Sequence, residues 1–149
     1  SLPSEVEVTE LFGPNDPKEA PRRLGEMGAP VVVIKLGREG CLVYERQTGE
    51  MTRLPVCRVD ARDPTGAGDS FCGGYLAGLL QTGDPVLAAV YGTVTSSFII
   101  SGFGVEYTYP VSGQEAQSRL QDFMKQCAQE VPGVRAKLER YPGNLPEQG

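Results

Sequence analysis

The part of the sequence that decides the fold reads Asp63-Pro64-Thr65-Gly66-Ala67-Gly68-Asp69-Ser70-Phe71-Cys72-Gly73-Gly74-Tyr75. Gly66-Ala67-Gly68 stands directly before an apolar run that we expect to be helical to about Gln81. The first amides of a helix have no partners within the helix, and glycines let an anion approach them closely. The turn therefore predicts a phosphate site. It is not a Walker A loop, because no Gly-Lys-Ser/Thr follows, nor a dinucleotide fingerprint, because Phe71 replaces the third glycine.

Asp69 adds a carboxylate to the first turn of this expected helix. The helix dipole favours its ionised form, which makes it a poor base towards a C–H bond. Phosphoryl transfer to an alcohol differs, because its transition state is loose and the hydroxyl needs orientation more than a strong base. The alternative interpretation is structural: an aspartate that favours a helix start, beside glycines that form a tight turn.

The same helix contains three interior glycines, Gly73, Gly74 and Gly78. Each costs about 1 kcal/mol relative to alanine, which indicates close packing against another backbone. Asp84-Pro85 is an N-cap followed by a first-turn proline, and it predicts a second helix to about Ile100. We expect the two helices to pack together, because the second also contains small residues: Gly92, Thr93, Thr95, Ser96 and Ser97.

The rest of the chain mixes strands and helices, which indicates the α/β class. The run Val31–Lys35 is apolar and β-branched, as in a strand buried on both faces. Further strands are expected at 41–45, 51–54 and 56–59, with a hairpin turn at 47–50. Capping boxes predict helices from Ser4 to Phe12 and after Ser112, and Asp16-Pro17 predicts one to about Met27. The last helix has an apolar stripe of Leu120, Phe123, Met124 and Cys127.

Composition excludes several classes of partner and of catalytic or metal site. The 149 residues carry 14 basic and 19 acidic side chains, a net charge of -5, and no histidine. The charge argues against nucleic-acid and anionic-membrane partners, and the missing histidine excludes imidazole bases and HExxH zinc sites. The four cysteines form no CxxC pair, which favours reduced thiols and a cytoplasmic protein. No stretch of 18 apolar residues predicts a membrane span.

The segment from Asp63 to Tyr75 closely resembles the second signature of the PfkB, or ribokinase-like, carbohydrate kinase family. Other segments resemble the family in the same order: the strand and turn from Val31 to Cys41, and Pro3–Glu7, which is similar to an Asn-x-x-Glu segment but has Ser4 for the asparagine. The resemblance implies a ribokinase-like, Rossmann-like three-layer α/β/α fold. It covers only the C-terminal half of that domain, at residues 1–130, and leaves 131–149 as a polar tail expected to be poorly ordered.

The resemblance also implies roles for individual residues. Asp69 would be the catalytic base, and the amides of Gly66, Ala67 and Gly68 an anion hole. ATP would lie along Lys35, Gly37 and Gly40, with Thr93 and the loop containing Gly104 near the adenine. Asp63 and Thr65 would hold a monovalent cation such as K⁺, and Glu7 would act through water on Mg²⁺. Structural interpretations stand beside these: Glu7 as a capping-box residue, Lys35 as a strand-end lysine, Asp63 as a turn residue and Thr93 as a small helix residue.

Two functions follow as hypotheses. One is an ATP-dependent kinase that phosphorylates a hydroxyl of a sugar or similar small alcohol. The other is a nucleotide-binding half without turnover that acts as a binding or regulatory module. An incomplete sheet would expose an apolar edge, so we also expect a homodimer or poor solubility for the isolated half. The fold alone does not choose the acceptor.

Overall fold

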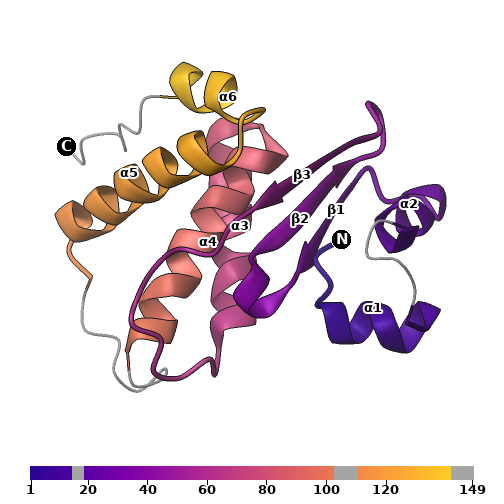
Figure 1. Ribbon diagram of the computed structural model, residues 1–149, viewed down its shortest axis with the longest axis horizontal. Coiled ribbons are helices and arrows are strands. Elements are labelled where there is room, and N and C mark those ends of the chain that lie inside the picture. Colours follow the sequence, from indigo (N-terminus) through magenta and orange to yellow (C-terminus); the bar gives the residue numbers. More distant parts are fainter. Residues whose placement is uncertain (15–18, 103–110, 142–149) are drawn as a thin grey trace. The chain divides into compact units, whose positions relative to one another are not determined.

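The computed structural model describes residues 1–14, 19–102 and 111–141 (Figure 1). Two compact units, Ser1–Val56 and Cys57–Gly149, make up the chain. Across the described ranges, no helix combines the length and the apolar character that a membrane span requires.

The first unit contains a three-stranded antiparallel sheet in the order β1-β2-β3. Its strands are β1 (Val31–Lys35), β2 (Cys41–Glu45) and β3 (Glu50–Leu54), and Val33 pairs with Val43, which pairs with Thr52. The N-terminal segment runs parallel to β1, because the Val33 amide donates to the Ser1 carbonyl at 2.8 Å and the Lys35 amide to the Pro3 carbonyl at 2.9 Å. The strand predictions for 31–35, 41–45 and 51–54 and the hairpin turn are confirmed.

Two helices, α1 (Glu5–Phe12) and α2 (Glu19–Glu26), lie on one side of this sheet (Figure 1). Val8 of α1 and Ala20 of α2 form a buried cluster with the side chains of one sheet face: Val32, Ile34, Leu36, Leu42 and Tyr44. Val33 and Val43, which point to the other face, are equally buried, at 0% and 1% exposure. As the run of β-branched residues predicted, β1 is therefore buried on both faces. The predicted cap of α2 at Asp16-Pro17 lies outside the described residues.

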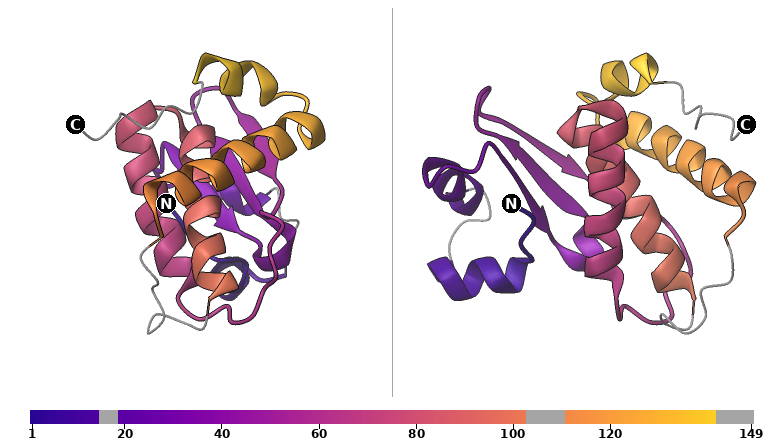
Figure 2. Two further views of the ribbon diagram at one scale, coloured as in Figure 1. Left: turned by 90° about the vertical axis from the view of Figure 1, so that its left-hand side faces the viewer. Right: turned by 180° about the vertical axis from the view of Figure 1, so that it is seen from behind.

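The second unit is helical. Its first two helices, α3 (Ala67–Thr82) and α4 (Pro85–Ser101), lie side by side (Figure 2). A Cβ on Gly74 would lie 2.3 Å from Thr95 Oγ1, and a Cβ on Gly78 would lie 2.7 Å from the Tyr91 Cβ. The predicted close packing of these two helices is confirmed, and two of the three α3 glycines explain it. Gly73 is different, because a Cβ there would meet nothing within 4 Å.

The N-caps of α4 and α5 are the residues that the sequence predicted. The Asp84 carboxylate accepts hydrogen bonds from the Val86 and Leu87 amides at 2.8 and 3.0 Å. Ser112 begins α5 (Gly113–Glu130) and accepts a hydrogen bond from the Glu115 amide at 3.1 Å. The predicted stripe of Leu120, Phe123, Met124 and Cys127 is buried.

Three parts of the chain differ from expectation. Residues 56–59 form no strand; Cys57 is buried and Arg58 is exposed, so the alternation of a strand is present, but no strand pairs with this segment in the described part of the chain. Composition predicted little order from Val131 onward, yet α6 (Arg135–Arg140) forms there, because Val134 and Leu138 are buried. Cys72 lies in an apolar run of the sequence, which predicts burial, yet its side chain is partly exposed.

Candidate functional site

The glycine turn before α3 has the geometry of an anion-binding helix start. Gly66 is the N-cap and adopts the left-handed conformation at φ 81°, which a residue with a side chain rarely adopts. The Ala67 amide donates to the Pro64 carbonyl at 3.1 Å, and the Ser70 amide donates to the Gly66 carbonyl at 3.1 Å. Within the described residues, the amides of Gly68 and Asp69 donate to no other group. Of the three amides predicted to form the anion hole, the one of Ala67 is therefore already used by the turn itself.

Asp69 lies in the first turn of α3, and its side chain is exposed. Ser70 beside it is held by its own helix, because its hydroxyl donates to the Ala67 carbonyl at 3.0 Å. Further along α3, Phe71 and Tyr75 are buried and stack on each other with ring centroids 6.3 Å apart, as expected for core residues. The helix thus fixes Asp69 through its buried side and leaves the carboxylate accessible.

Asp63 and Thr65 form the turn that leads into these glycines. The Asp63 carboxylate accepts a hydrogen bond from the Thr65 amide at 2.9 Å. Hydrogen bonds from the Thr65 side chain and backbone lower the pKa of Asp63, so this carboxylate stays ionised at neutral pH. The turn interpretation of Asp63 is confirmed, and the partly exposed carboxylate keeps an oxygen that a cation could bind.

Glu7 and Lys35 lie close together in the first unit. Lys35 ends β1, beside the N-terminal segment that leads to Ser4 and Glu7. Glu7 Oε2 accepts hydrogen bonds from the Ser4 amide at 2.6 Å and from the Ser4 hydroxyl at 2.8 Å, which completes the predicted capping box. These bonds, and to a smaller extent the charge of Lys35, lower the pKa of Glu7. The capping interpretation of Glu7 is confirmed, and the residue presents a fixed negative charge near Lys35.

Gly37 and Gly40 bracket the turn that follows Lys35. A short 3₁₀ helix, η1 (Gly37–Glu39), occupies it, and both glycines have positive φ, at 56° and 88°. A Cβ on Gly40 would lie 2.0 Å from the Leu54 carbonyl oxygen, whereas a Cβ on Gly37 would meet nothing within 4 Å. Close packing against the Leu54 carbonyl thus explains why position 40 is a glycine, whereas the backbone at Gly37 is open to a ligand.

Thr93 is a buried residue of α4, 6% exposed, and its hydroxyl donates to the Ala89 carbonyl at 2.8 Å. Gly104, also predicted near the nucleotide, lies outside the described residues. Among the residues that the structure describes, no group of three or more aspartate, glutamate or cysteine side chains could hold a metal ion on its own.

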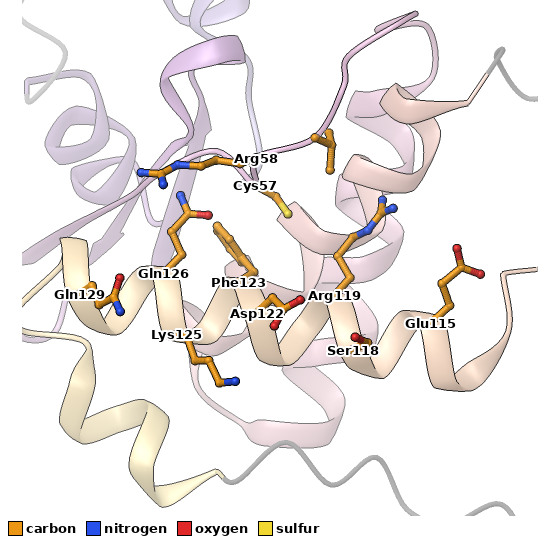
Figure 3. Close-up of a pocket in the computed structure, with 11 residues that line it drawn as sticks. Cys57, Arg58, Glu115, Ser118, Arg119, Asp122, Phe123, Lys125, Gln126 and Gln129 are labelled. Atoms are coloured by element: carbon orange, nitrogen blue, oxygen red, sulfur yellow. The ribbon is translucent and has the colours of Figure 1, made fainter.

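Sequence reasoning missed a groove in the second unit (Figure 3). It has a volume of about 510 Å³ and lies between the segment Cys57–Val59 and the face of α5 from Glu115 to Gln129. Arg119 and Phe123 rise from α5 beside Cys57, and burial raises the pKa of the Cys57 thiol. None of the candidate site residues inferred from the sequence lines this groove.

Comparison with known proteins identifies the family. The model of the pfkB family of carbohydrate kinases matches residues 2–111. The chain is 45% identical over 77 residues to a cytidine kinase of Thermococcus kodakarensis, which covers 52% of this chain and 28% of that protein. It is 34% identical over 110 residues to the 2-dehydro-3-deoxygluconokinase of Thermoproteus tenax, which covers 74% of this chain and 33% of that protein. The chain thus spans less than half the length of these curated relatives.

Solved structures agree with this assignment. Ribokinase from Thermotoga maritima superposes with a TM-score of 0.70 at 27% identity, over 80% of this chain and 41% of that protein. A fructokinase from Vibrio cholerae, solved with fructose, ADP and a potassium ion, has a TM-score of 0.68 at 26% identity, over 80% of this chain and 39% of that protein. The predicted partial α/β fold is therefore confirmed. The chain belongs to the pfkB family of carbohydrate kinases and carries part of the ribokinase-like domain.

Proposed function

We propose that this chain carries the phosphoryl-transfer part of a kinase that moves the γ-phosphoryl group of ATP to a hydroxyl of a sugar, a nucleoside or a similar small alcohol. One observation carries the proposal: an exposed carboxylate, Asp69, lies in the first turn of a helix whose leading amides at Gly68 and Asp69 have no acceptor among the described residues. The relatives named above are sugar and nucleoside kinases, which supports the same activity.

In this mechanism, Asp69 accepts the proton of the acceptor hydroxyl as its oxygen attacks the γ-phosphorus. The bond from that phosphorus to the β,γ-bridging oxygen breaks, and ADP leaves. Negative charge on the transferred group lies in front of the α3 start, where partial positive charge and unpaired amides stabilise it. The Gly68 amide would donate directly to the transferred group. Gly66, in its left-handed conformation, directs the chain into α3. The Ala67 amide can contribute only if it leaves the Pro64 carbonyl.

The nucleotide is proposed to lie along Lys35 and the open backbone at Gly37, with Gly40 shaping the turn. Thr93 and Gly104 remain assigned to the neighbourhood of the adenine by resemblance. For Thr93, the buried hydroxyl supports a role in packing more than direct hydrogen bonding to the base.

One cation is proposed for each unit. Mg²⁺ is usually held by one or two carboxylates, waters and the substrate phosphates rather than by a full protein cage, and the ionised Glu7 fits such a water-mediated role. When bound, it would neutralise charge on the phosphates. K⁺ is proposed to bind at the Asp63–Thr65 turn, where the partly exposed Asp63 carboxylate is kept ionised.

The test is turnover of the Asp69→Asn variant with Mg-ATP and a panel of sugars and nucleosides. General base catalysis contributes about a hundredfold or more, so we expect turnover to fall by at least that factor. Asp60→Asn, an equal change of charge at another exposed residue of the same unit, should leave turnover within twofold. Turnover of Asp69→Asn within a few-fold of the unsubstituted protein would show that Asp69 is not the base.

The second proposed function is nucleotide binding without turnover. The open backbone at Gly37 beside the strand-end Lys35 supports nucleotide binding whether or not turnover follows. Calorimetric titration with Mg-ATP, paired with a turnover assay on the same sample, separates the two. Heat of binding without phosphorylated product supports this second function, and product formation rejects it. The variant Lys35→Met should weaken the heat of binding under either function.

A further inference from the structure

The segment that carries Asp63 is anchored to the last turn of α4. The Ile100 carbonyl accepts hydrogen bonds from the Arg62 amide at 2.8 Å and from the Asp63 amide at 3.3 Å. The last carbonyls of a helix have no partners within it, so this one is available for an outside amide. From Asp63 the bonds continue through its carboxylate to the Thr65 amide. A continuous set of hydrogen bonds thus joins the end of α4 to the turn before α3.

Arg119 of α5 holds that last turn of α4. Its Nη1 donates to the hydroxyl of Ser97 at 3.2 Å and to the hydroxyl of Ser101 at 3.3 Å. Its guanidinium carbon lies 3.7 Å from the centre of the Phe98 ring, within the range of a cation–π contact. The two serines are one turn apart, on either side of the turn that presents Ile100. One guanidinium therefore contacts three of the last five residues of α4.

The two serine hydroxyls that accept hydrogen bonds from Arg119 are themselves held in place by the helix. Ser97 is 1% exposed and donates to the Val94 carbonyl at 2.6 Å, and Ser101 donates to the Phe98 carbonyl at 3.3 Å. Both hydroxyls thus use their proton on the helix backbone and offer their lone pairs to the guanidinium. These bonds are partly buried, so water and salt screen them less than the exposed ion pair Arg135–Glu139.

We propose that Arg119 is a positioning residue for the phosphoryl-transfer site: by holding the last turn of α4 it fixes the Asp63–Gly66 segment, and with it the amides at the start of α3. The residue touches neither Asp69 nor the glycine turn, and it acts through Ile100. The consequence for catalysis rests on the proposed kinase function, whereas the consequence for the order of the segment does not.

The test is amide hydrogen exchange, resolved by residue, in Arg119→Met, which keeps the apolar stem and removes the donors. We expect the amides of Arg62, Asp63 and Thr65 to exchange about tenfold faster or more, while those of Tyr75 to Leu79 in α3 change less than twofold. Arg119→Lys retains a positive charge but not the planar fork, and it should recover part of the protection. The matched control Arg135→Met should leave the amides of Arg62, Asp63 and Thr65 unchanged.

A second variant covers the case in which Arg119→Met does not fold. Ser101→Ala removes one acceptor of Arg119 and should give the same local pattern with a smaller amplitude. Unchanged exchange at Arg62, Asp63 and Thr65 overturns the proposal. So does a uniform increase across α3 and α4, because that pattern reports general loss of stability rather than positioning.

Turnover measurements then distinguish a failure of the positioning role from a failure of the proposed kinase function. If Asp69→Asn abolishes turnover, Arg119→Met should lower kcat more than it raises the KM for ATP. If Asp69→Asn leaves turnover intact, the kinase assignment of Asp69 fails, and the exchange result still decides whether Arg119 orders the segment. Loss of turnover in Asp69→Asn together with normal exchange and normal kcat in Arg119→Met rejects the positioning role alone.

Discussion

The carboxylates of Glu7 and Asp63 are each fixed by a backbone amide two or three residues away. Glu7 accepts from the Ser4 amide, and Asp63 accepts from the Thr65 amide. Such short-range bonds depend on local backbone geometry, which the Ser-x-x-Glu and Asp-Pro-Thr patterns specify directly. The sequence therefore predicted the structural roles of both residues. The structure adds that Glu7 is exposed, that Asp63 is partly exposed, and that both carboxylates are ionised at neutral pH.

The lowered pKa values of Glu7 and Asp63 predict how the stability of the folded protein depends on pH. The folded pKa of Glu7 lies below its ordinary value of 4.5, and that of Asp63 lies below 3.8. A lowered pKa stabilises the folded protein above the unfolded pKa, and this stabilisation is lost as the pH falls through the lowered folded value. We expect Ser4→Ala to move the pKa of Glu7 up towards 4.5, measured by carboxyl-carbon NMR titration.

The control for this titration is Thr9→Ala on the same helix. The Thr9 hydroxyl donates to the Glu5 carbonyl at 2.8 Å and does not contact Glu7. A shift of the Glu7 pKa in Thr9→Ala as large as in Ser4→Ala would mean that helix stability, and not the bonds from Ser4, sets the pKa.

At the scale of elements, the pair α3 and α4 has the most constrained packing in the second unit. Gly74 and Gly78 let the two helices approach so closely that a methyl group on either would clash with Thr95 or Tyr91. Gly73 lies one residue before Gly74 on a different face, and space is open around it. From the sequence alone, close packing was equally expected at all three glycines, and only the orientation of the helix distinguishes them.

We therefore expect opposite effects of alanine at neighbouring positions. Gly74→Ala and Gly78→Ala should lower the free energy of unfolding by about 1–3 kcal/mol through overpacking. Gly73→Ala should raise it by about 1 kcal/mol, because alanine is the better helix former and meets no obstacle. Urea denaturation of the three variants measures this. Equal stability of Gly73→Ala and Gly74→Ala would contradict the packing of α3 against α4.

At the scale of the whole molecule, one face of α3 remains apolar and exposed. Leu76 is 54% exposed and Leu80 is 90% exposed, and Gly73 and Ala77 lie on the same face by helical spacing. Large exposed apolar side chains in line along a helix are typical of a contact surface. Asp69 precedes Gly73 by one turn, so this surface begins at the proposed site.

For the 149-residue chain in isolation we expect self-association through this face. The double variant Leu76→Lys, Leu80→Lys should shift the mass measured by light scattering towards the 16.0 kDa of one chain. Leu11→Lys, which introduces the same charge at a 69% exposed leucine of α1, serves as the control. A monomeric unsubstituted chain, or an equal effect of Leu11→Lys, would contradict a specific role of α3.

Much of the fold followed from sequence alone, because its determinants are local. Capping residues set the starts of α1, α4 and α5, β-branched runs set β1, and Gly66 with Gly68 set the turn before α3. The same segment made Asp69 a candidate base, and its close resemblance to the PfkB signature pointed to the family. Local geometry suffices for these features, so one segment of sequence can specify them.

Only the tertiary structure decided the features that depend on distant residues. It showed that α6 forms through burial of Val134 and Leu138, and that residues 56–59 lack a strand partner in the described part of the chain. It also brought Arg119 to Ser97 and Ser101, 22 and 18 positions away, and the Ile100 carbonyl to the Asp63 amide. Hydrogen bonding and burial between segments far apart in the chain depend on how the helices pack, and no local pattern records that.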